Sequence, residues 1–187
     1  MIAALATTNE GKVRELAALL APAIELAPAP RGYEGPQETG ETYLENARIK
    51  ARALAAITRS AALADDSGLE VEALGGRPGV HSSRYGATAA ERNARLLDEL
   101  RGRVGDERRA RFRTVLVLVR PDGSELAAEG TCEGVIANEP RGDRGFGYDP
   151  VFLVPELGRT FAELRAEEKA VRSSRALAAR ALLAAFR

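Results

Sequence analysis

The sequence predicts an α/β protein with a mixed central β-sheet. Short apolar runs with the character of buried strands alternate with segments whose apolar residues recur at helical spacing. In the second half, two strand-like runs flank the turn sequence "PDGS", which predicts a β-hairpin. The alternation and the hairpin together indicate an α/β class whose sheet contains strands of both directions.

The first elements are a strand, a turn and a helix. Residues 2–6 form a short apolar run, and the polar turn "TTNEG" follows it. A helix is expected over residues 12–20, since apolar side chains recur there at helical spacing, at Val13, Leu16, Leu19 and Leu20. The Pro- and Gly-rich segment "APAPRGYEGPQETGE" then connects to the next helix.

A capping signal begins the second helix, "TYLENARIKARALAAI". Thr42 followed by Glu45 is a capping-box pattern, although Thr39 could cap the helix instead. An inner strand is expected at residues 61–64. Residues 75–87 are rich in Gly, Pro and Ser and are expected to form a loop.

The second half begins with a helix, which Thr88 and Glu91 mark and which ends near residue 101. The hairpin follows, formed by "ARFRTVLVLVR" and "ELAAEGTCEGVIA". After it come the glycine-rich loop "NEPRGDRGFGYDP" and the short strand "VFLVP". A single helix is expected over residues 164–186, with apolar side chains at Val171, Leu177, Leu182, Leu183 and Phe186.

Composition is ordinary for a soluble globular protein, with 45% hydrophobic residues in 187. We expect one domain over residues 1–187, with residues 105–137 as a β-hairpin extension. No apolar run approaches the roughly 20 residues of a membrane span, and the N-terminus lacks signal-peptide features. The only cysteine, Cys132, cannot form an internal disulfide, which fits a cytoplasmic location.

The charge balance excludes some classes of partner. The 27 basic residues equal the 27 acidic ones, whereas a general nucleic-acid binder carries a basic excess, so neither nucleic acid nor membrane is expected as a partner. His81 is the only histidine, so a zinc cluster is not expected. Of the 27 basic residues, 24 are arginine and only Lys12, Lys50 and Lys169 are lysine. A lysine can serve a phosphate as a compact charge, but retention by chance explains any one of them equally well.

Asp65 and Asp66 directly follow the inner strand, where two adjacent carboxylates are costly unless something compensates them. Glu38, Glu41 and Glu45 lie at the entry to the second helix. Carboxylates from separate elements can hold Mg²⁺ together with water and phosphate oxygens. Interaction with the helix dipole accounts for Glu41, but it does not account for two aspartates at the end of a strand.

Two further segments could contact a nucleotide. "TTNEGK" places short polar residues, a glycine and a lysine at a helix N-terminus, which is an anion site, although Thr8 or Asn9 could simply be the N-cap. In "GFGYDP", the glycines around Phe146 allow the ring to stack on a base, unless Phe146 and Tyr148 pack into the core. "EEKAVRSSR" is expected to place Lys169, Arg172 and Arg175 on one helix, as a phosphate or base contact or as a solvated basic face.

Five blocks of the sequence resemble the inosine triphosphate pyrophosphatase family. In order along the chain they are "ATTNEGKVREL", "ETGETYLENARIKA", "ADDSGLEVEALGGRPGVHSSRY", "GFGYDPVF" and "EKAVRSSR". The resemblance spans nearly the whole chain. It implies Mg²⁺-dependent hydrolysis of ITP, dITP and XTP to the monophosphate and pyrophosphate. It also implies an elongated, two-lobed α/β fold around a central mixed sheet, and a homodimer.

The same resemblance assigns roles to individual residues. Asp66 is the expected proton acceptor, and Glu38 and Asp66 are the expected metal ligands. The expected contacts with the nucleoside triphosphate are Thr7, Thr8, Asn9, Glu10, Gly11, Lys12, Ser67, Phe146, Gly147, Tyr148, Asp149, Lys169, Ser174 and Arg175. Whether Asp65 also binds metal stays open, and Lys50 could be structural.

Two positions depart from the family pattern. Ser174 stands where the family usually has histidine, so only a backbone contact with the substrate is expected to survive there. His81 stands where tyrosine is common, and it is expected to be a substituted loop residue without a catalytic role.

Two alternative functions are a Maf-like nucleotide pyrophosphatase of other base specificity, which would lack "GFGYDP", and a non-catalytic nucleotide or RNA binder. The balanced charge and the Asp65-Asp66-Ser67 set argue against the binder.

Overall fold

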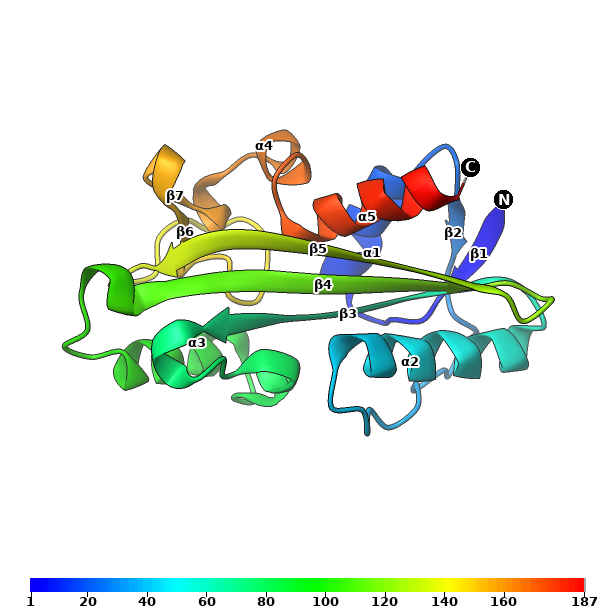
Figure 1. Ribbon diagram of the computed structural model, residues 1–187, viewed down its shortest axis with the longest axis horizontal. Helices are drawn as coiled ribbons and strands as arrows, with labels where there is room; N and C mark the ends of the chain where they lie inside the picture. The colour runs from blue at the N-terminus through cyan, green and yellow to red at the C-terminus, as the bar shows by residue number, and fades with distance from the viewer. Residues whose placement is uncertain (187) are drawn as a thin grey trace. The chain divides into compact units, whose positions relative to one another are not determined.

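The computed structural model describes residues 1–186 and contains a seven-stranded sheet in the order β2-β1-β3-β4-β5-β6-β7 (Figure 1). β1 pairs in parallel with β2 and β3, whereas β6 pairs antiparallel with β5 and β7, so the predicted mixed α/β sheet is confirmed. The strands are β1 (Ile2–Leu5), β2 (Glu25–Ala27), β3 (Ala62–Val71), β4 (Arg109–Val119), β5 (Glu125–Ile136), β6 (Phe152–Val154) and β7 (Arg159–Thr160).

Five α-helices and several 3₁₀ turns accompany the sheet within the described residues. The α-helices are α1 (Glu10–Leu20), α2 (Tyr43–Thr58), α3 (Ala89–Glu99), α4 (Ala166–Ala170) and α5 (Ser174–Ala185). Over residues 1–186, none of the helices is long and apolar enough to cross a membrane.

The chain divides into two compact units. Unit 1 comprises residues 1–66, 114–130 and 174–187, and unit 2 comprises residues 67–113 and 131–173. The strands β3, β4 and β5 contribute residues to both units. The prediction of one domain with a hairpin extension is not decided by this division and stays a prediction.

In unit 1, helices cover both faces of the sheet. α1 and α5 lie side by side on one face, and α2 covers the other (Figure 1). The core on the α1 and α5 side is aliphatic and includes the fully buried Leu5, Leu16, Leu63, Leu116 and Leu182. These leucines come from segments whose apolar spacing predicted helices and strands, so burial of the apolar faces explains their packing.

Unit 2 has a core of its own, centred on three phenylalanines. The rings of Phe112 and Phe152 lie 4.6 Å apart, and those of Phe152 and Phe161 lie 4.9 Å apart. Phe152 and Phe161 are fully buried. Centroid separations in this range are typical of favourable aromatic pairs.

Two elements differ from the sequence prediction. The inner strand does not end at residue 64, because β3 continues to Val71 and buries Leu69 and Val71 beyond the acidic pair. Asp65 and Asp66 therefore lie in the middle of a strand. Within the predicted loop, residues 79–84 form a 3₁₀ helix.

The single C-terminal helix predicted over residues 164–186 is also wrong. α4 ends at Ala170, and α5 begins only at Ser174. Between them the turn tightens, since the backbone N–H groups of Arg172 and Ser173 both donate to the carbonyl oxygen of Lys169. Serine is favoured directly before a helix, and Ser173 stands there. Lys169 and Arg175 consequently belong to different helices and to different units.

Short strands were missed, and one open question is settled. β2 and β7 contain three and two residues, too few for a periodicity to be recognised.

Thr42, not Thr39, is the N-cap of α2. Its hydroxyl accepts from the backbone N–H of Glu45, and the Glu45 carboxylate accepts from that of Thr42, which completes a capping box.

Replacing Thr42 with alanine removes the N-cap acceptor of α2. We expect Thr42→Ala to destabilise the protein by about 1 kcal/mol, which lowers Tm by about 2–4 °C in a chain of this size. Thr39→Ala is the matched control, since Thr39 is exposed and caps no helix. Thermal unfolding followed by circular dichroism measures both, and equal Tm values for the two variants would contradict the assigned cap.

Candidate active site

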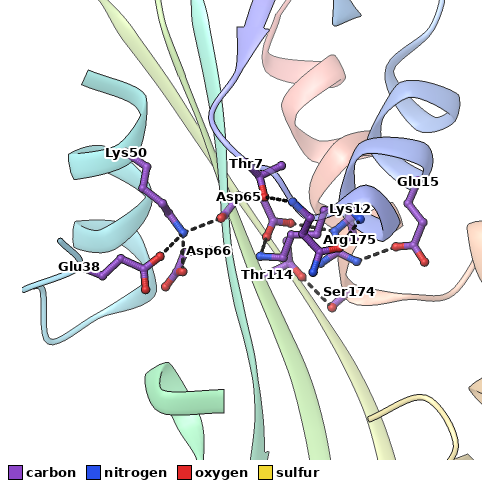
Figure 2. Close-up of polar contacts among 11 residues, drawn as sticks. Thr7, Lys12, Glu15, Glu38, Lys50, Asp65, Asp66, Thr114, Ser174 and Arg175 are labelled. Carbon is purple, nitrogen blue, oxygen red and sulfur yellow. Dashed lines mark hydrogen bonds and ion pairs between the residues drawn. The ribbon is translucent and has the colours of Figure 1, made fainter. Parts of the chain in front are cut away.

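The acidic pair on β3 is the centre of the polar cluster in unit 1 (Figure 2). Successive side chains of a strand point to opposite faces of the sheet. Asp65 accordingly meets residues of α1 and α5, whereas Asp66 meets Lys50 of α2 and the preceding Glu38. The strand thus gives each carboxylate its own cationic partners.

Asp65 is a fully buried anion held by two cations. Its Oδ1 accepts from Lys12 Nζ, and its Oδ2 accepts from Arg175 Nε at 2.8 Å. Arg175 Nη1 donates in turn to Glu15 of α1 at 2.6 Å. Burial opposes ionisation of Asp65, but the attraction of Arg175 and Lys12 outweighs it and holds its pKa well below the usual range. Burial lowers the pKa of Lys12, and Asp65 only partly offsets this.

Asp66 and Glu38 share one cation, the ammonium of Lys50. Lys50 Nζ donates to Asp66 Oδ1 at 2.7 Å, to Glu38 Oε1 at 2.8 Å and to the backbone oxygen of Asp65 at 2.8 Å. Burial lowers the pKa of Lys50, but Asp66 and Glu38 together raise it above its ordinary value. For Asp66, burial raises the pKa and outweighs the opposing effect of Lys50.

The second oxygen of Asp66 marks a place for a further ligand. Asp66 Oδ2 is buried and has no hydrogen-bond partner, and an unsatisfied buried carboxylate oxygen is costly. Since Glu38 and Asp66 converge on one cation, their oxygens suit Mg²⁺, which takes one or two carboxylates together with water and phosphate oxygens. Over residues 1–186, there is no group of three or more His, Cys, Asp or Glu side chains that could hold a metal ion.

Asp65 is a poor candidate for a metal ligand, because Lys12 and Arg175 engage its two oxygens. These contacts favour a role for Asp65 in holding the two cations instead of binding a metal ion. Asp66 is the member of the pair with an available oxygen.

The "TTNEGK" segment leads into the N-terminus of α1, and of Thr8 and Asn9 it is Asn9 that caps the helix. Asn9 is the N-cap, and its side chain accepts from the backbone N–H of Lys12 at 3.1 Å. The hydroxyl of Thr7 accepts from the Asn9 N–H, while Thr8 and Glu10 are exposed and Gly11 is buried. The cap fixes the start of the helix from which Lys12 reaches Asp65.

The "GFGYDP" loop belongs to unit 2 and contains its own ion pair. Asp149 Oδ2 accepts from Lys169 Nζ at 2.6 Å and from the backbone N–H of Phe146 at 2.8 Å. Lys169 Nζ also lies 5.1 Å from the ring centroid of Phe146. At Gly145, whose φ is +74°, a Cβ would lie 2.0 Å from Asp149 Oδ2. The loop can fold onto Asp149 only because this position has no side chain.

The two aromatic side chains of this loop differ. Phe146 is half-buried, whereas Tyr148 is packed in the core and its hydroxyl donates to the Ser82 carbonyl at 2.9 Å. Burial raises the pKa of Tyr148. Gly147 is held by Asn93, whose side-chain nitrogen donates to its carbonyl oxygen at 3.1 Å. Phe146 is therefore the ring of the pair that is partly accessible for stacking.

Ser174 and Ser67 complete the set of expected site residues. Ser174, at the start of α5, is buried and shares a 2.9 Å hydrogen bond with the Thr114 hydroxyl. A Cβ on Gly130 would lie 2.2 Å from the Ser174 backbone oxygen, so β5 passes directly against this turn. Ser67 follows Asp66 on β3 and is half-buried.

Sequence reasoning missed two residues of the cluster, Glu15 and Thr114, and gave a third, Lys50, no role in the site. Glu15 was hidden among ordinary helix carboxylates, and Thr114 had the appearance of a strand residue. Lys50 did give a signal, because it is one of three lysines in an arginine-rich chain. The expected common helix for Lys169 and Arg175 is wrong, as described above, and their side chains pair within separate units.

Taken together, the mixed sheet, the carboxylates of β3 and the cationic side chains of α1, α2 and α5 define an α/β protein equipped for a polyphosphate with a divalent cation. Comparison with known proteins agrees with this class. Residues 3–185 match the Ham1 family. The chain belongs to this family, and the resemblance recognised in the sequence is confirmed.

Relatives and solved structures cover nearly the whole chain. It is 57% identical to a dITP/XTP pyrophosphatase of Thermus thermophilus and 47% identical to that of Escherichia coli (strain K12), over 98% of this chain and 90% and 96% of those proteins. A HAM1 protein structure from Coxiella burnetii has a TM-score of 0.87 at 42% identity, covering 100% of this chain and 98% of that one. The nucleoside-triphosphatase (dITP/XTP pyrophosphatase) structure from Mycobacterium abscessus has a TM-score of 0.75 at 40% identity, with the same coverage.

The two aspartates should respond differently to loss of charge. Asp65→Asn leaves Lys12 and Arg175 buried beside a neutral group, and we expect destabilisation of about 3 kcal/mol or more, roughly 6–12 °C in Tm. Asp66→Asn removes a charge that burial disfavours, so its Tm should stay near that of the wild type. Thermal unfolding in metal-free buffer compares the two variants. A larger loss for Asp66→Asn would show that the burial argument assigns the wrong aspartate.

Proposed function

We propose that the chain hydrolyses the noncanonical purine nucleoside triphosphates ITP, dITP and XTP to the monophosphate and pyrophosphate with Mg²⁺, and so cleanses the nucleotide pool. The observation that carries this is the 47–57% identity, over nearly the full chain, to proteins named dITP/XTP pyrophosphatase. The enzyme is a nucleoside triphosphate pyrophosphatase. The polar cluster of unit 1 supports the proposal, because it combines an available carboxylate oxygen with phosphate-binding cations.

The triphosphate is held by the N-terminal segment of α1, through Thr7, Thr8, Asn9, Glu10, Gly11 and Lys12. The positive end of the helix dipole favours an anion at this place, and Lys12 adds a full charge. Attack of water on the α-phosphorus builds negative charge on the phosphoryl oxygens, which Lys12 offsets. Ser67, next to Asp66 on β3, contributes a further polar contact.

Asp66 accepts the proton of the attacking water. Its Oδ2 has no hydrogen-bond partner among the described residues, so this oxygen is the one available to accept the proton. Glu38 and Asp66 would hold Mg²⁺, which neutralises phosphate charge and acidifies water when bound. Lys50 keeps the two carboxylates together from the side of α2.

Base recognition uses the residues of the "GFGYDP" loop with Lys169, Ser174 and Arg175. Phe146 stacks on the purine, and Gly147, Tyr148 and Asp149 shape the loop around it. Hydrogen-bond donors such as Arg175, Lys169 or backbone N–H groups match the 6-oxygen of hypoxanthine or xanthine. An amino group at that position leaves these donors unpaired, which disfavours ATP. At Ser174, whose hydroxyl bonds with Thr114, the contact is made by the backbone.

The assembly and location follow from the same family likeness. We propose that the enzyme works as a homodimer in the cytoplasm, and that residues 1–187 act as one catalytic domain with residues 105–137 as its hairpin extension. The buried, unpaired thiol of Cys132 is compatible with a reducing compartment. Light scattering coupled to size-exclusion chromatography tests the dimer directly.

Steady-state kinetics with a panel of nucleotides tests the proposed activity. With Mg²⁺, kcat/KM for ITP, dITP and XTP should exceed that for ATP and GTP by at least about 10²-fold, since donors that face the 6-amino group of ATP or the 2-amino group of GTP are left unpaired. Product analysis should find pyrophosphate and the monophosphate, with no orthophosphate. Equal rates on all purines would show that the base site does not discriminate, and absence of turnover would contradict the enzyme assignment.

Replacing Asp66 with asparagine should remove the proton acceptor without loss of the fold. We expect Asp66→Asn to lower kcat for ITP by about 10²–10⁴-fold, the usual contribution of a general base. His81→Ala is the control, since His81 is exposed on the 3₁₀ helix of residues 79–84 and should leave turnover unchanged. Full turnover in Asp66→Asn would refute its assigned role.

A further inference from the structure

Glu38 lies in a Pro- and Gly-rich segment of residues 28–42 that forms no helix or strand. Its carboxylate nevertheless meets Lys50 and, through it, Asp66 on β3. A carboxylate binds a cation more tightly when its backbone is already fixed, because ordering a mobile segment costs conformational entropy at each binding event. Something in the fold must therefore hold this segment in place.

Asn46, in the first turns of α2, bonds to the segment two residues after Glu38. The side chain of Asn46 is fully buried, and its Oδ1 accepts from the backbone N–H of Gly40 at 2.8 Å. Since an N–H can only donate, this bond fixes the orientation of the amide and identifies Oδ1 as the acceptor. The opposite atom, Asn46 Nδ2, is buried without a hydrogen-bond partner, a cost that the fold tolerates at this position.

Gly40 fits against α2 because it has no side chain. A Cβ there would lie 2.6 Å from the Cβ of Glu45 and 2.8 Å from Asn46 Oδ1. Both contacts are shorter than real Cβ atoms allow, so any larger residue would push the segment away from the helix. The backbone of Gly40 thus packs directly on the side chain that binds it.

The next two backbone N–H groups are held by the neighbour of Asn46. Glu45 Oε2 accepts from Glu41 N–H at 2.8 Å and from Thr42 N–H at 3.1 Å. Adjacent side chains of α2 therefore fix three consecutive backbone N–H groups, at residues 40–42. The capping box accounts for the bond to Thr42, but the bond from Asn46 to Gly40 lies beyond the cap and closer to Glu38.

The same helix carries Lys50 one turn after Asn46, and residues four apart share a face of a helix. One face of α2 therefore holds the segment at Gly40 and binds the Glu38 carboxylate at Lys50. The distance in sequence from Gly40 to Glu38 is only two residues, so a shift at Gly40 is transmitted to the carboxylate.

We propose that Asn46, with Gly40, is a positioning residue that sets the Glu38 carboxylate for binding of the divalent cation. This inference rests on the proposed metal role of Glu38 and Asp66. Asn46 touches neither the substrate nor the cation. It acts through the backbone of residues 38–40, and partners that orient a metal ligand typically change metal affinity by about 10–100-fold when they are removed.

Binding of Mn²⁺ to the nucleotide-free protein, followed by electron paramagnetic resonance, tests this without reference to turnover. Asn46→Ala should weaken Mn²⁺ affinity by about 10-fold, and Gly40→Ala should weaken it similarly although Asn46 and every charged residue are retained. Asn46→Asp keeps an acceptor for the Gly40 N–H, so its loss of Mn²⁺ affinity should be smaller than that of Asn46→Ala even though it adds a buried charge. Asn93→Ala is the matched control, because Asn93 is a buried asparagine of unit 2 that also bonds to a backbone glycine.

The outcomes separate this inference from the proposed metal site. If Glu38→Gln and Asp66→Asn weaken Mn²⁺ binding but Asn46→Ala and Gly40→Ala do not, the positioning role is wrong and the metal site stands. If Glu38→Gln and Asp66→Asn leave Mn²⁺ binding unchanged, the metal site itself is wrong. An equal loss of affinity in Asn93→Ala would show a general effect of destabilisation and would overturn the inference, so Tm is measured for every variant.

Discussion

Two carboxylates at adjacent positions of a buried strand would repel each other strongly if they shared one environment. On β3 they do not, since the alternation of a strand sends Asp65 to one face of the sheet and Asp66 to the other. This separation is the constraint on which the rest of unit 1 depends. Each face must supply its own positive charge, and α1, α2 and α5 each contribute a cationic side chain, from Lys12, Lys50 and Arg175.

The two faces solve the problem differently. Around Asp65 the charges are balanced, because Lys12 and Arg175 are matched by Asp65 and Glu15. A buried ion pair contributes little net stability compared with apolar packing, yet removing one member is costly. Such a cluster fixes α1 and α5 relative to β3 within unit 1. Around Asp66 the arrangement is open, since two carboxylates face one ammonium and one oxygen has no partner.

Much of this could be predicted from the sequence. Apolar spacing and capping patterns predicted α1, α2 and α3, the turn "PDGS" predicted the hairpin, and the adjacent aspartates indicated a cation site. The failures have a physical cause in each case. β3 was predicted too short because its polar residues 65–67 interrupt an apolar run, although the strand stays largely buried through Val71. The break between α4 and α5 has no proline or glycine to announce it, only a serine pair at residues 173–174.

The residues that sequence reasoning missed share one property: their partners are distant in the chain. Arg175 bonds to Glu15, 160 residues away, and Thr114 bonds to Ser174, 60 residues away. Local patterns carry no information about such pairs. Lys50 and Asn46 lie on a helix whose start was predicted correctly, but their roles depend on where the irregular segment around Glu38 returns to that helix.

The position of Lys50 connects these arguments. Its ammonium has three N–H bonds, and they reach Glu38, Asp66 and the backbone oxygen of Asp65. Lys50 therefore balances part of the negative charge of the two carboxylates, and it links Glu38 of the irregular segment to Asp66 on β3. A guanidinium, which is larger and planar, would not place one compact charge between these three oxygens. This geometry gives a physical reason for a lysine in a chain that otherwise uses arginine at 24 of its 27 basic positions.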